Sequence, residues 1–418
     1  MTDAAVDRVL AAEVLSQAQA DRDSVLELAA ELIRVPSRGG VDSYEPVLAV
    51  LEGWFTGRGL SARRLHDGSG APVGLVAEVY GGLPGPTWVL DACVDTAPLG
   101  DESLWSFPPF AGDIEAGWLR GRGSADSKAA AAAFCHIAAR FQARGASFPG
   151  RLAVLLDCDE HTGTFGGALA YLSQLGDQTV GGVMIGYPGL DELVVGGRGV
   201  YRARLRVSGT AAHSGSSKPA AANAAVRAAW LVGRLSELVL PQPLPGGFPL
   251  PPKLTVTEVS AGGGFTTVPD AACVAVDIRL TDTLASDDAE LLLKEVCARL
   301  DRDMPGPEAT RIEPVVSWPP FRLSEGEQPA QALRDAVLQV GLPVRSKVAG
   351  PSNIGNLLAK SGIRATAGFG PHYEGLHGTD ERIRVAELPQ VQAAYHLAVL
   401  NLLGAQRAGI DSELTIRR

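Results

Sequence analysis

The sequence predicts an α/β protein with a mostly parallel central sheet flanked by helices and a second, inserted α+β domain. Between Thr87 and Asp157, a buried-type strand, an alanine-rich helix and another buried-type strand follow one another, which is typical of a parallel sheet. After about Val194 the pattern changes to alternating strands and amphipathic helices. The 418 residues are enough for two hydrophobic cores, so two domains are expected.

The first half of the larger domain can be divided by its hydrophobic periodicity. Residues 25–33 (VLELAAELI) repeat apolar side chains at helical spacing and stop at the Val35–Pro36 step, because the residue before a proline disfavours helix. Residues 74–80 (GLVAEVY) and 87–95 (TWVLDACVD) are strand-like runs separated by the turn-forming GGLPGP. A helix that leads into a loop and two strands are therefore expected here.

Two further elements locate a candidate site. Residues 127–141 are rich in alanine and predict a buried helix, and residues 151–157 (RLAVLLD) predict a buried strand. In open α/β sheets, ligands bind at the carboxyl ends of the strands. The polar residues just after Leu90 and Leu156 are therefore where functional side chains are expected.

The central part of the chain predicts a small domain of its own. Its elements follow the order strand, helix, strand, strand, helix, strand, a βαββαβ arrangement. They are expected at residues 200–209, 223–238, 253–263, 273–281, 287–300 and 311–317. From about Pro319 the chain returns to segments that rejoin the first domain. We therefore predict one domain at 1–193 and 319–418, interrupted by an inserted domain at 194–318.

Composition narrows the class of partner. The formal net charge of -10 argues against nucleic-acid and anionic-membrane surfaces, which need clustered Lys and Arg. The start MTDAAVDRVLAAEVL lacks the pattern of a secretory signal, and no apolar run approaches the ~20 residues that span a bilayer. The five cysteines are odd in number and widely spaced, which does not suggest a disulfide framework. A cytoplasmic protein with a small-molecule partner is expected.

Four separate segments place acidic, histidine or cysteine side chains just beyond a predicted strand or in a glycine-rich loop. They are DACVDTAP (91–98), GRGSADSK (121–128), DCDEHTG (157–163) and GLHGTDER (375–382). Taken alone, an aspartate in a glycine loop is usually a turn residue, and a lone histidine is usually a surface or core residue. Together the segments supply carboxylate and imidazole ligands and a separate carboxylate as proton acceptor, as a hydrolytic zinc site requires.

In order and spacing these segments resemble the signature of the zinc-dependent family that includes aminoacylase, carboxypeptidase G, acetylornithine deacetylase and succinyl-diaminopimelate desuccinylase. That signature runs GHxDxVP, GRGxxDMK, DEExG, GEP and a C-terminal His in an HxxDE context. The resemblance extends to the inserted domain through SGTAAHSG and VPDAACVAVDIR. It implies that the larger domain is the catalytic domain and that the inserted domain is a lid and dimerisation domain.

The resemblance implies a metal site with altered ligands. Asp126 matches the carboxylate that bridges two zinc ions, and His161 and His377 complete one of the two sites. Cys93 and Tyr187 complete the other, where the family has His and Glu. Because His161 also replaces a Glu, three of the five ligand positions differ from the signature. Two histidines and one carboxylate suit Zn²⁺ and leave a position open for water, so one zinc is expected to bind firmly.

The second metal site is expected to be weak or absent. Cys93 could bind a metal as a thiolate, but Tyr187 has an ordinary pKa of about 10 and would have to lose its proton. Two other interpretations of Cys93 stay open, a neutral replacement for the family histidine and a nucleophile at a strand end.

Two carboxylates are expected to act around the metal. By resemblance, Glu160 is the general base that takes a proton from water and passes it to the leaving nitrogen. Asp95 resembles the carboxylate that orients the histidine ligand, but Cys93 has no ring N–H for it to accept. Asp95 could instead raise the pKa of Cys93 by like-charge repulsion.

The resemblance also assigns residues to the substrate. His213 would polarise the scissile carbonyl in the partner subunit of a homodimer formed through the inserted domain, and Arg279 would hold a substrate carboxylate. A turn histidine and an exposed strand arginine are the alternative interpretations. The glycine-rich loops GPSNIGN, with Ser352 and Asn353, and GFGPHYEG are expected to line the pocket and offer backbone N–H groups to an anionic substrate.

The expected function is metal-dependent hydrolysis of an amide bond in an N-acyl amino acid or a short peptide with a free carboxylate. The alternative is a diverged family member that catalyses cyclisation or acyl transfer, or only binds a ligand, at a degraded or metal-free site. The three ligand changes favour the alternative, whereas the retained Asp126, Glu160 and His377 favour hydrolysis.

Overall fold

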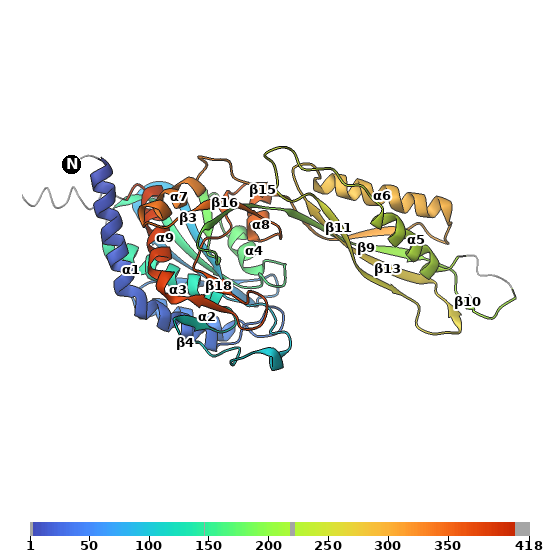
Figure 1. Ribbon diagram of the computed structural model, residues 1–418, viewed down its shortest axis with the longest axis horizontal. Coiled ribbons are helices and arrows are strands. Elements are labelled where there is room, and N and C mark those ends of the chain that lie inside the picture. The colour runs from blue at the N-terminus through green and yellow to red at the C-terminus, as the bar shows by residue number, and fades with distance from the viewer. Residues whose placement is uncertain (1–2, 146, 218–221, 406–418) are drawn as a thin grey trace, which may run out of the picture. The chain divides into compact units, whose positions relative to one another are not determined.

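The computed structural model describes residues 3–145, 147–217 and 222–405, which divide into two compact units (Figure 1). Unit 1 comprises the described residues of 1–196, 323–347 and 353–418, and unit 2 those of 197–322 and 348–352. The predicted domain ranges also include residues 1–2, 146, 218–221 and 406–418, which lie outside the described residues.

Unit 1 is built around a six-stranded mixed sheet with strand order β1-β2-β6-β3-β7-β17. The pairs β6-β3, β3-β7 and β7-β17 are parallel, while β1-β2 and β2-β6 are antiparallel. The strands are β1 (Ala62–His66), β2 (Pro72–Tyr80), β3 (Gly82–Cys93), β6 (Phe148–Asp157), β7 (Val180–Ile185) and β17 (Ala365–Thr366). The predicted α/β class is confirmed, and the strands predicted on either side of the alanine-rich helix pair in parallel.

Helices cover both faces of this sheet (Figure 1). Helix α3 (Ala129–Arg144) packs on β2, β3 and β6, with α1 (Asp3–Arg34) and α9 (Leu388–Leu402) packed against it. Helix α4 (Gly166–Ser173) packs on the other face, against β1, β2 and β6. The remaining helical segments are α2 (Glu45–Thr56), α7 (Ala330–Gln339), α8 (Ile354–Lys360), η1 (Glu102–Leu104), η2 (Ser124–Lys128) and η3 (Val385–Glu387). Within the described ranges, none of the helices combines the length and apolar character needed to cross a membrane.

Helix α1 is longer than the sequence analysis predicts. The expected helix covers residues 25–33, whereas the observed one covers Asp3–Arg34 and ends just before the Val35–Pro36 step. Leu10, Val14 and Ala18 are buried in the added part at helical spacing. These apolar residues are separated by alanines and polar residues, so their periodicity is weaker than that of VLELAAELI.

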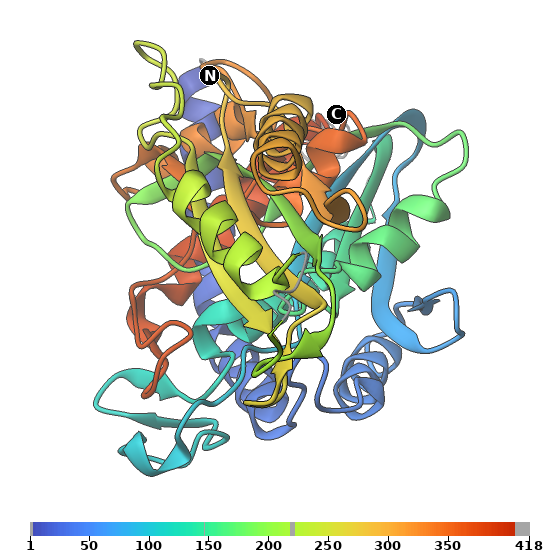
Figure 2. The same cartoon turned by 90° about the vertical axis from the view of Figure 1, so that its right-hand side faces the viewer.

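Unit 2 contains a four-stranded antiparallel sheet of order β11-β13-β9-β14, with two helices on one face (Figure 2). Its elements are β9 (Gly199–Ser208), α5 (Ala224–Ser236), β11 (Lys253–Ala261), β13 (Ala271–Leu280), α6 (Ser286–Asp303) and β14 (Arg311–Trp318). This is the βαββαβ order that the sequence predicts, with a short ribbon of β10 (Ala212–His213) and β12 (Thr267–Val268) added. Leu205, Val274, Leu231 and Leu293 are fully buried between the sheet and the helices.

A second sheet of unit 1 brings two site loops together. It has the order β18-β19-β5-β4 and consists of β4 (Asp113–Glu115), β5 (Trp118–Arg120), β18 (Tyr373–Glu374) and β19 (Arg382–Arg384). Strand β5 leads into the loop that carries Asp126, and β18 and β19 flank the loop that carries His377. The short strands β8 (Glu192–Gly197), β15 (Phe321–Arg322) and β16 (Arg345–Ala349) lie where the chain passes from one unit to the other.

Candidate active site

The candidate site lies at the carboxyl ends of two neighbouring parallel strands. Cys93 ends β3 and is in register with Asp157, which ends β6. Because the strands are parallel, the residues that follow them emerge at the same edge of the sheet. Asp95 follows β3, and Glu160 and His161 follow β6, so the strand pairing brings two of the four predicted segments together.

Asp126, His161 and His377 converge on one point, although they are far apart in the sequence. Oδ2 of Asp126 lies 2.8 Å from Nε2 of His377 and 3.3 Å from Nε2 of His161. The ligand atoms of the three residues all lie within 4.8 Å of one another. A single cation with metal–ligand bonds of about 2 Å can be reached by all three side chains at this spacing.

The state of His161 shows that these residues fit a metal ion. Both ring nitrogens of His161 are buried, and neither makes a hydrogen bond to any group in the described parts of the chain. Burial by itself raises the pKa of Asp126, but the charges of His161 and His377 and the hydrogen bond with His377 lower it far below its ordinary value. An anionic carboxylate beside two imidazole nitrogens, one of them otherwise unpaired, is a donor set suited to Zn²⁺.

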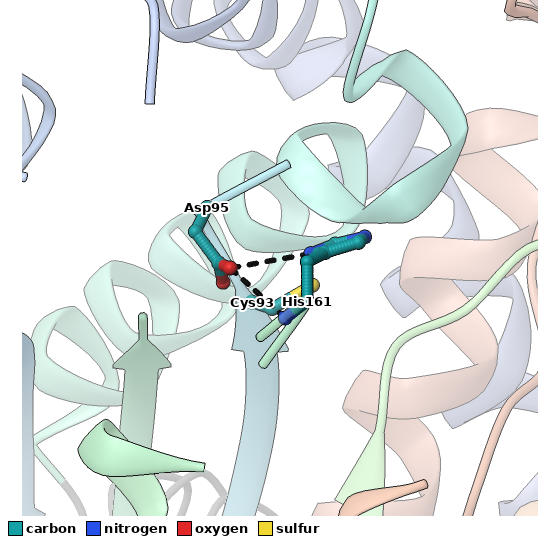
Figure 3. Close-up of side chains that lie close together, drawn as sticks. All are labelled: Cys93, Asp95 and His161. Carbon is teal, nitrogen blue, oxygen red and sulfur yellow. Dashed lines mark hydrogen bonds and ion pairs between the residues drawn. The ribbon is translucent and has the colours of Figure 1, made fainter. Parts of the chain in front are cut away.

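Asp95 holds His161 in position from the other side (Figure 3). Its Oδ1 accepts the backbone N–H of Glu160 at 3.2 Å, and its Oδ2 accepts that of His161 at 3.0 Å. Oδ2 also lies 3.3 Å from Nδ1 of the His161 ring. A carboxylate at Nδ1 and the metal-facing Nε2 form the arrangement that usually orients a ligating histidine. Because position 93 is a cysteine, the sequence suggests no imidazole ring that Asp95 could orient. In the structure Asp95 orients the ring of His161 instead.

The second oxygen of Asp126 faces neutral donors. Sγ of Cys93 lies 3.4 Å from Oδ1 of Asp126, and the Ser127 hydroxyl donates to the same oxygen at 3.1 Å. Burial raises the pKa of Cys93 well above its ordinary value, and the charges of Asp126, Glu160 and Asp95 raise it further, in that order. The repulsion expected from Asp95 is therefore present but is not the largest contribution. A protonated thiol favours the neutral-replacement interpretation over a thiolate ligand or a nucleophile.

Tyr187, the other residue of the second metal site, is also held in its neutral form. Burial, followed by the charges of Asp126 and Glu160, raises the pKa of Tyr187 above its ordinary value. Cys93, Asp95 and His161 do form another group of donor atoms within 4.8 Å of one another. Asp95, however, already accepts two backbone N–H groups. In the set of Asp126, His161 and His377, by contrast, the ligand atoms contact mainly one another, and Nε2 of His161 has no hydrogen-bond partner among the described residues.

Glu160 lies beside this set. Its Oε2 is 3.6 Å from Nδ1 of His161, and its side chain is 23% exposed. Burial raises the pKa of Glu160 to about 7, with His161 opposing the shift and Asp126 and Asp95 adding to it. A carboxyl group that titrates near neutrality is suited to take up a proton and return it.

Two charged residues that the sequence analysis did not single out hold the Asp126 loop. Oε1 of Glu381 accepts the backbone N–H groups of Gly123, Ala125 and Asp126 at 3.1, 2.9 and 3.2 Å. Its Oε2 pairs with Arg122 at 2.6 Å, and both side chains are 1% exposed. Both residues stand inside the quoted motifs GRGSADSK and GLHGTDER. The two motifs were expected to meet at the site, and they carry opposite charges at Arg122 and Glu381. This was the sequence signal from which the ion pair could have been predicted.

The predicted oxyanion residue, His213, belongs to unit 2. It lies on the exposed ribbon strand β10, where its Nδ1 accepts the backbone N–H of Gly215 at 3.0 Å. With Nδ1 acting as an acceptor, a neutral His213 carries its proton on Nε2. This tautomer can donate a hydrogen bond, as the predicted role requires.

The predicted substrate-binding residues already have partners within the chain. Nε of Arg279 lies 2.8 Å from Asp277, and its Nη1 donates to the Ser352 hydroxyl at 3.3 Å. Asn353 caps helix α8, because its side chain accepts the N–H of Gly355 at 2.9 Å. A substrate carboxylate would therefore have to share Arg279 with Asp277.

Asp91 and Asp157 form a buried pair of carboxyl groups on the sheet face that carries Cys93. Asp157 on β6 is in register with Cys93 on β3. Asp91 stands two residues before Cys93 on β3, so its side chain lies on the same face of the sheet. Among the described residues, none of the four carboxyl oxygens has a hydrogen-bond partner. Burial raises the pKa of Asp91 to about 7, and burial and the charge of Asp91 raise that of Asp157.

Replacing Asp91 with asparagine is expected to raise the free energy of unfolding above pH 7. The pKa of about 7 in the folded protein exceeds the ordinary aspartate value of about 3.9, so the folded state binds the proton more tightly. Wild-type stability therefore falls as the pH rises between these values and then levels off.

Asparagine buries no charge, so the expected gain is about 1–3 kcal/mol at pH 8 and close to zero near pH 4. Urea unfolding at both pH values measures it, with the exposed Asp23→Asn as the matched control. A variant that is less stable than the wild type at pH 8 would contradict this account.

The fold and the site together define a class of protein. An α/β unit that holds two histidines and a carboxylate within reach of one cation, beside a carboxyl group that titrates near neutrality, is typical of metallohydrolases. Residues 90–401 match the profile of Peptidase family M20/M25/M40. The chain belongs to this family, which confirms the resemblance found in the sequence and makes the protein a hydrolase that acts on amide bonds.

Individual relatives agree with this assignment. The chain is 31% identical over 334 residues to the succinyl-diaminopimelate desuccinylase of Alkalilimnicola ehrlichii, covering 77% of this chain and 86% of that protein. An M20 family metallo-carboxypeptidase from Sulfolobus solfataricus has the same fold, with a TM-score of 0.74 at 18% identity over 90% of this chain and 99% of that one. A dinuclear metal-binding M20 peptidase from Bacillus subtilis gives a TM-score of 0.69 at 14% identity, with 92% and 99% coverage.

Proposed function

We propose that this protein hydrolyses the amide bond of an N-acyl amino acid or a short peptide with a free carboxylate, using one zinc ion held by Asp126, His161 and His377. The observation that carries the proposal is the two-sided environment of Asp126. Its Oδ2 faces two imidazole nitrogens, whereas its Oδ1 receives neutral contacts from Cys93 and Ser127. The side of Asp126 that would meet a second metal is thus already occupied.

Glu160 is the general base in this proposal. It takes a proton from the attacking water, the water oxygen adds to the carbonyl carbon, and the proton passes to the nitrogen as the C–N bond breaks. Asp95 fixes the position of Glu160 by accepting its backbone N–H. When bound, the zinc ion would act as a Lewis acid and lower the pKa of water. The pKa of about 7 for Glu160 supports a role that needs both protonation states.

The name of one relative indicates the substrate class. The relative named succinyl-diaminopimelate desuccinylase acts on an N-acyl amino acid, which fits the substrate proposed here. We propose that Arg279, whose Nη1 contacts the Ser352 hydroxyl, holds the substrate carboxylate together with Ser352 and Asn353. We also propose that His213 donates its Nε2–H to the scissile carbonyl in the partner subunit of a homodimer formed through unit 2.

Metal analysis tests the single-zinc site. The purified wild-type protein is expected to bind one zinc per chain and to hydrolyse members of a panel of N-acetyl and N-succinyl amino acids. The double variant Cys93→His, Tyr187→Glu restores the family ligands and is expected to bind two. Zinc per chain, measured by plasma mass spectrometry after gel filtration, gives both numbers. No gain in the double variant would show that the residue matching at positions 93 and 187 is wrong, and a wild type without zinc or hydrolysis would favour the non-hydrolytic alternative.

A further inference from the structure

We propose that the hydroxyl of Tyr187 donates a hydrogen bond to the carbonyl oxygen of the scissile amide as that oxygen becomes negatively charged. The proposal rests on the amide hydrolysis proposed above. It gives a positive role to a residue that otherwise only replaces a metal ligand. Three features of the structure carry it, namely the place of Tyr187 in the sheet, the way its ring is held, and the surroundings of its hydroxyl.

The end of strand β7 places Tyr187 close to Cys93. In the parallel pair β3-β7, Asp91 is in register with Ile185. Strand β7 ends there, but the N–H of Gly186 still donates to the Asp91 carbonyl at 2.8 Å, so Tyr187 follows just past the end of β7, as Cys93 follows Asp91 on β3. The Cys93 thiol contacts Oδ1 of Asp126 at 3.4 Å. Tyr187 therefore stands next to the side of Asp126 that faces away from the two histidines.

The Tyr187 ring is held by its apolar surroundings. It lines a small cavity together with Ala125, Phe134, Phe369 and Tyr395. Its backbone pairs with Phe369 in an isolated β-bridge. The neighbouring glycines allow this close approach, because a Cβ at position 368 would come within 2.7 Å of Tyr187 Cβ, and one at 370 within 2.3 Å of its carbonyl oxygen. A donor on a ring fixed in this way is positioned before the substrate arrives.

The Tyr187 hydroxyl is available to a ligand. Within the described ranges no group hydrogen-bonds to it, whereas the hydroxyl of the neighbouring Tyr395 is engaged by the carbonyl oxygens of Ile185 and Phe369 at 3.0 and 2.8 Å. The carboxylates whose charges act on Tyr187 are Asp126 and Glu160. In the proposed hydrolysis, these groups flank the position where water and the amide meet. A neutral donor there can bind an oxyanion without bringing a further negative charge into the site.

The proposed role requires no net change at Tyr187. As the water oxygen attacks the carbonyl carbon, the π electrons of the carbonyl move onto its oxygen, and the O–H of Tyr187 donates to that oxygen. When the C–N bond breaks, these electrons re-form the carbonyl, and the proton held by Glu160 moves to the leaving nitrogen. Tyr187 keeps its own proton throughout, as a phenol with an ordinary pKa of about 10 does at neutral pH.

The variant Tyr187→Phe tests this role, because it removes only the hydroxyl. We expect kcat for an N-succinyl amino acid to fall about 10²- to 10³-fold, as for other single oxyanion donors. KM should change by less than about threefold, since the contact forms mainly in the transition state. A phosphinic analogue of the same substrate should bind to Tyr187→Phe more weakly than to the wild type, by a factor close to the loss in kcat. The zinc content of the variant should stay at the wild-type value.

Tyr171→Phe is the matched control, because it removes a buried hydroxyl that has no partner within the described residues and lies on helix α4. This control should keep wild-type kinetics. Full activity of Tyr187→Phe, or loss of its zinc, would overturn the proposed role. If the wild type hydrolyses its substrate and Glu160→Gln does not, then full activity or zinc loss in Tyr187→Phe rejects only the role of Tyr187, and the proposed function stands. If the wild type hydrolyses nothing, the proposed function fails with it.

Discussion

The variant Glu160→Gln is expected to lose hydrolysis, with kcat lower by about 10²- to 10⁴-fold. Glutamine keeps the size and polarity of the side chain but cannot take a proton from water. The ligand set of Asp126, His161 and His377 does not include Glu160, so zinc content should stay at the wild-type value. Steady-state kinetics and metal analysis of the same preparation measure both quantities.

The pH dependence of wild-type activity is a second test of the role of Glu160. In the proposed mechanism Glu160 acts as a base in its ionised form, so kcat/KM should rise as the pH passes through the pKa of about 7 and then level off. Glu27→Gln, an exposed change on helix α1, is the matched control and should behave as the wild type. A Glu160→Gln protein that keeps a tenth or more of the wild-type kcat would remove Glu160 from the mechanism.

The variant His161→Ala is expected to lose zinc, and hydrolysis with it. In the proposed site His161 provides one of three ligand atoms, and its Nε2 is buried with no hydrogen-bond partner among the described residues. Loss of a group that merely orients a ligand weakens metal binding about 10- to 100-fold. Loss of the ligand itself should have a larger effect, so little metal should remain after gel filtration.

Zinc titration with a competing chelator measures this loss. His66→Ala, at an exposed position on strand β1, is the matched control and should keep wild-type affinity. If His161→Ala binds zinc as tightly as the wild type, then His161 is not a ligand, and the metal must be held by a different set of side chains.

Much of the fold could be predicted from the sequence because it depends on local patterns. Hydrophobic periodicity located the strands that begin near Gly74, Thr87 and Arg151, and it gave the element order of unit 2. It gave only the last third of α1, because the apolar residues of its first turns are scattered among alanines. The antiparallel pairing of β2 with β6 was also out of reach, since pairing depends on contacts between strands rather than on either strand alone.

The sequence by itself determined the family, the four segments that carry the site, and the departures at positions 93, 161 and 187. These follow from residue identity and spacing. Only the tertiary structure decided how the altered residues work together. It placed the His161 ring between Asp95 and Asp126, and it set Cys93 and Ser127 against the second oxygen of Asp126.

The Arg122–Glu381 pair that holds the Asp126 loop also became visible only in the structure. The physical reason is the same in each case. Hydrogen bonds, burial and pKa shifts depend on distances between segments that are up to 259 residues apart, and a sequence gives the identity of these groups but not the distances between them.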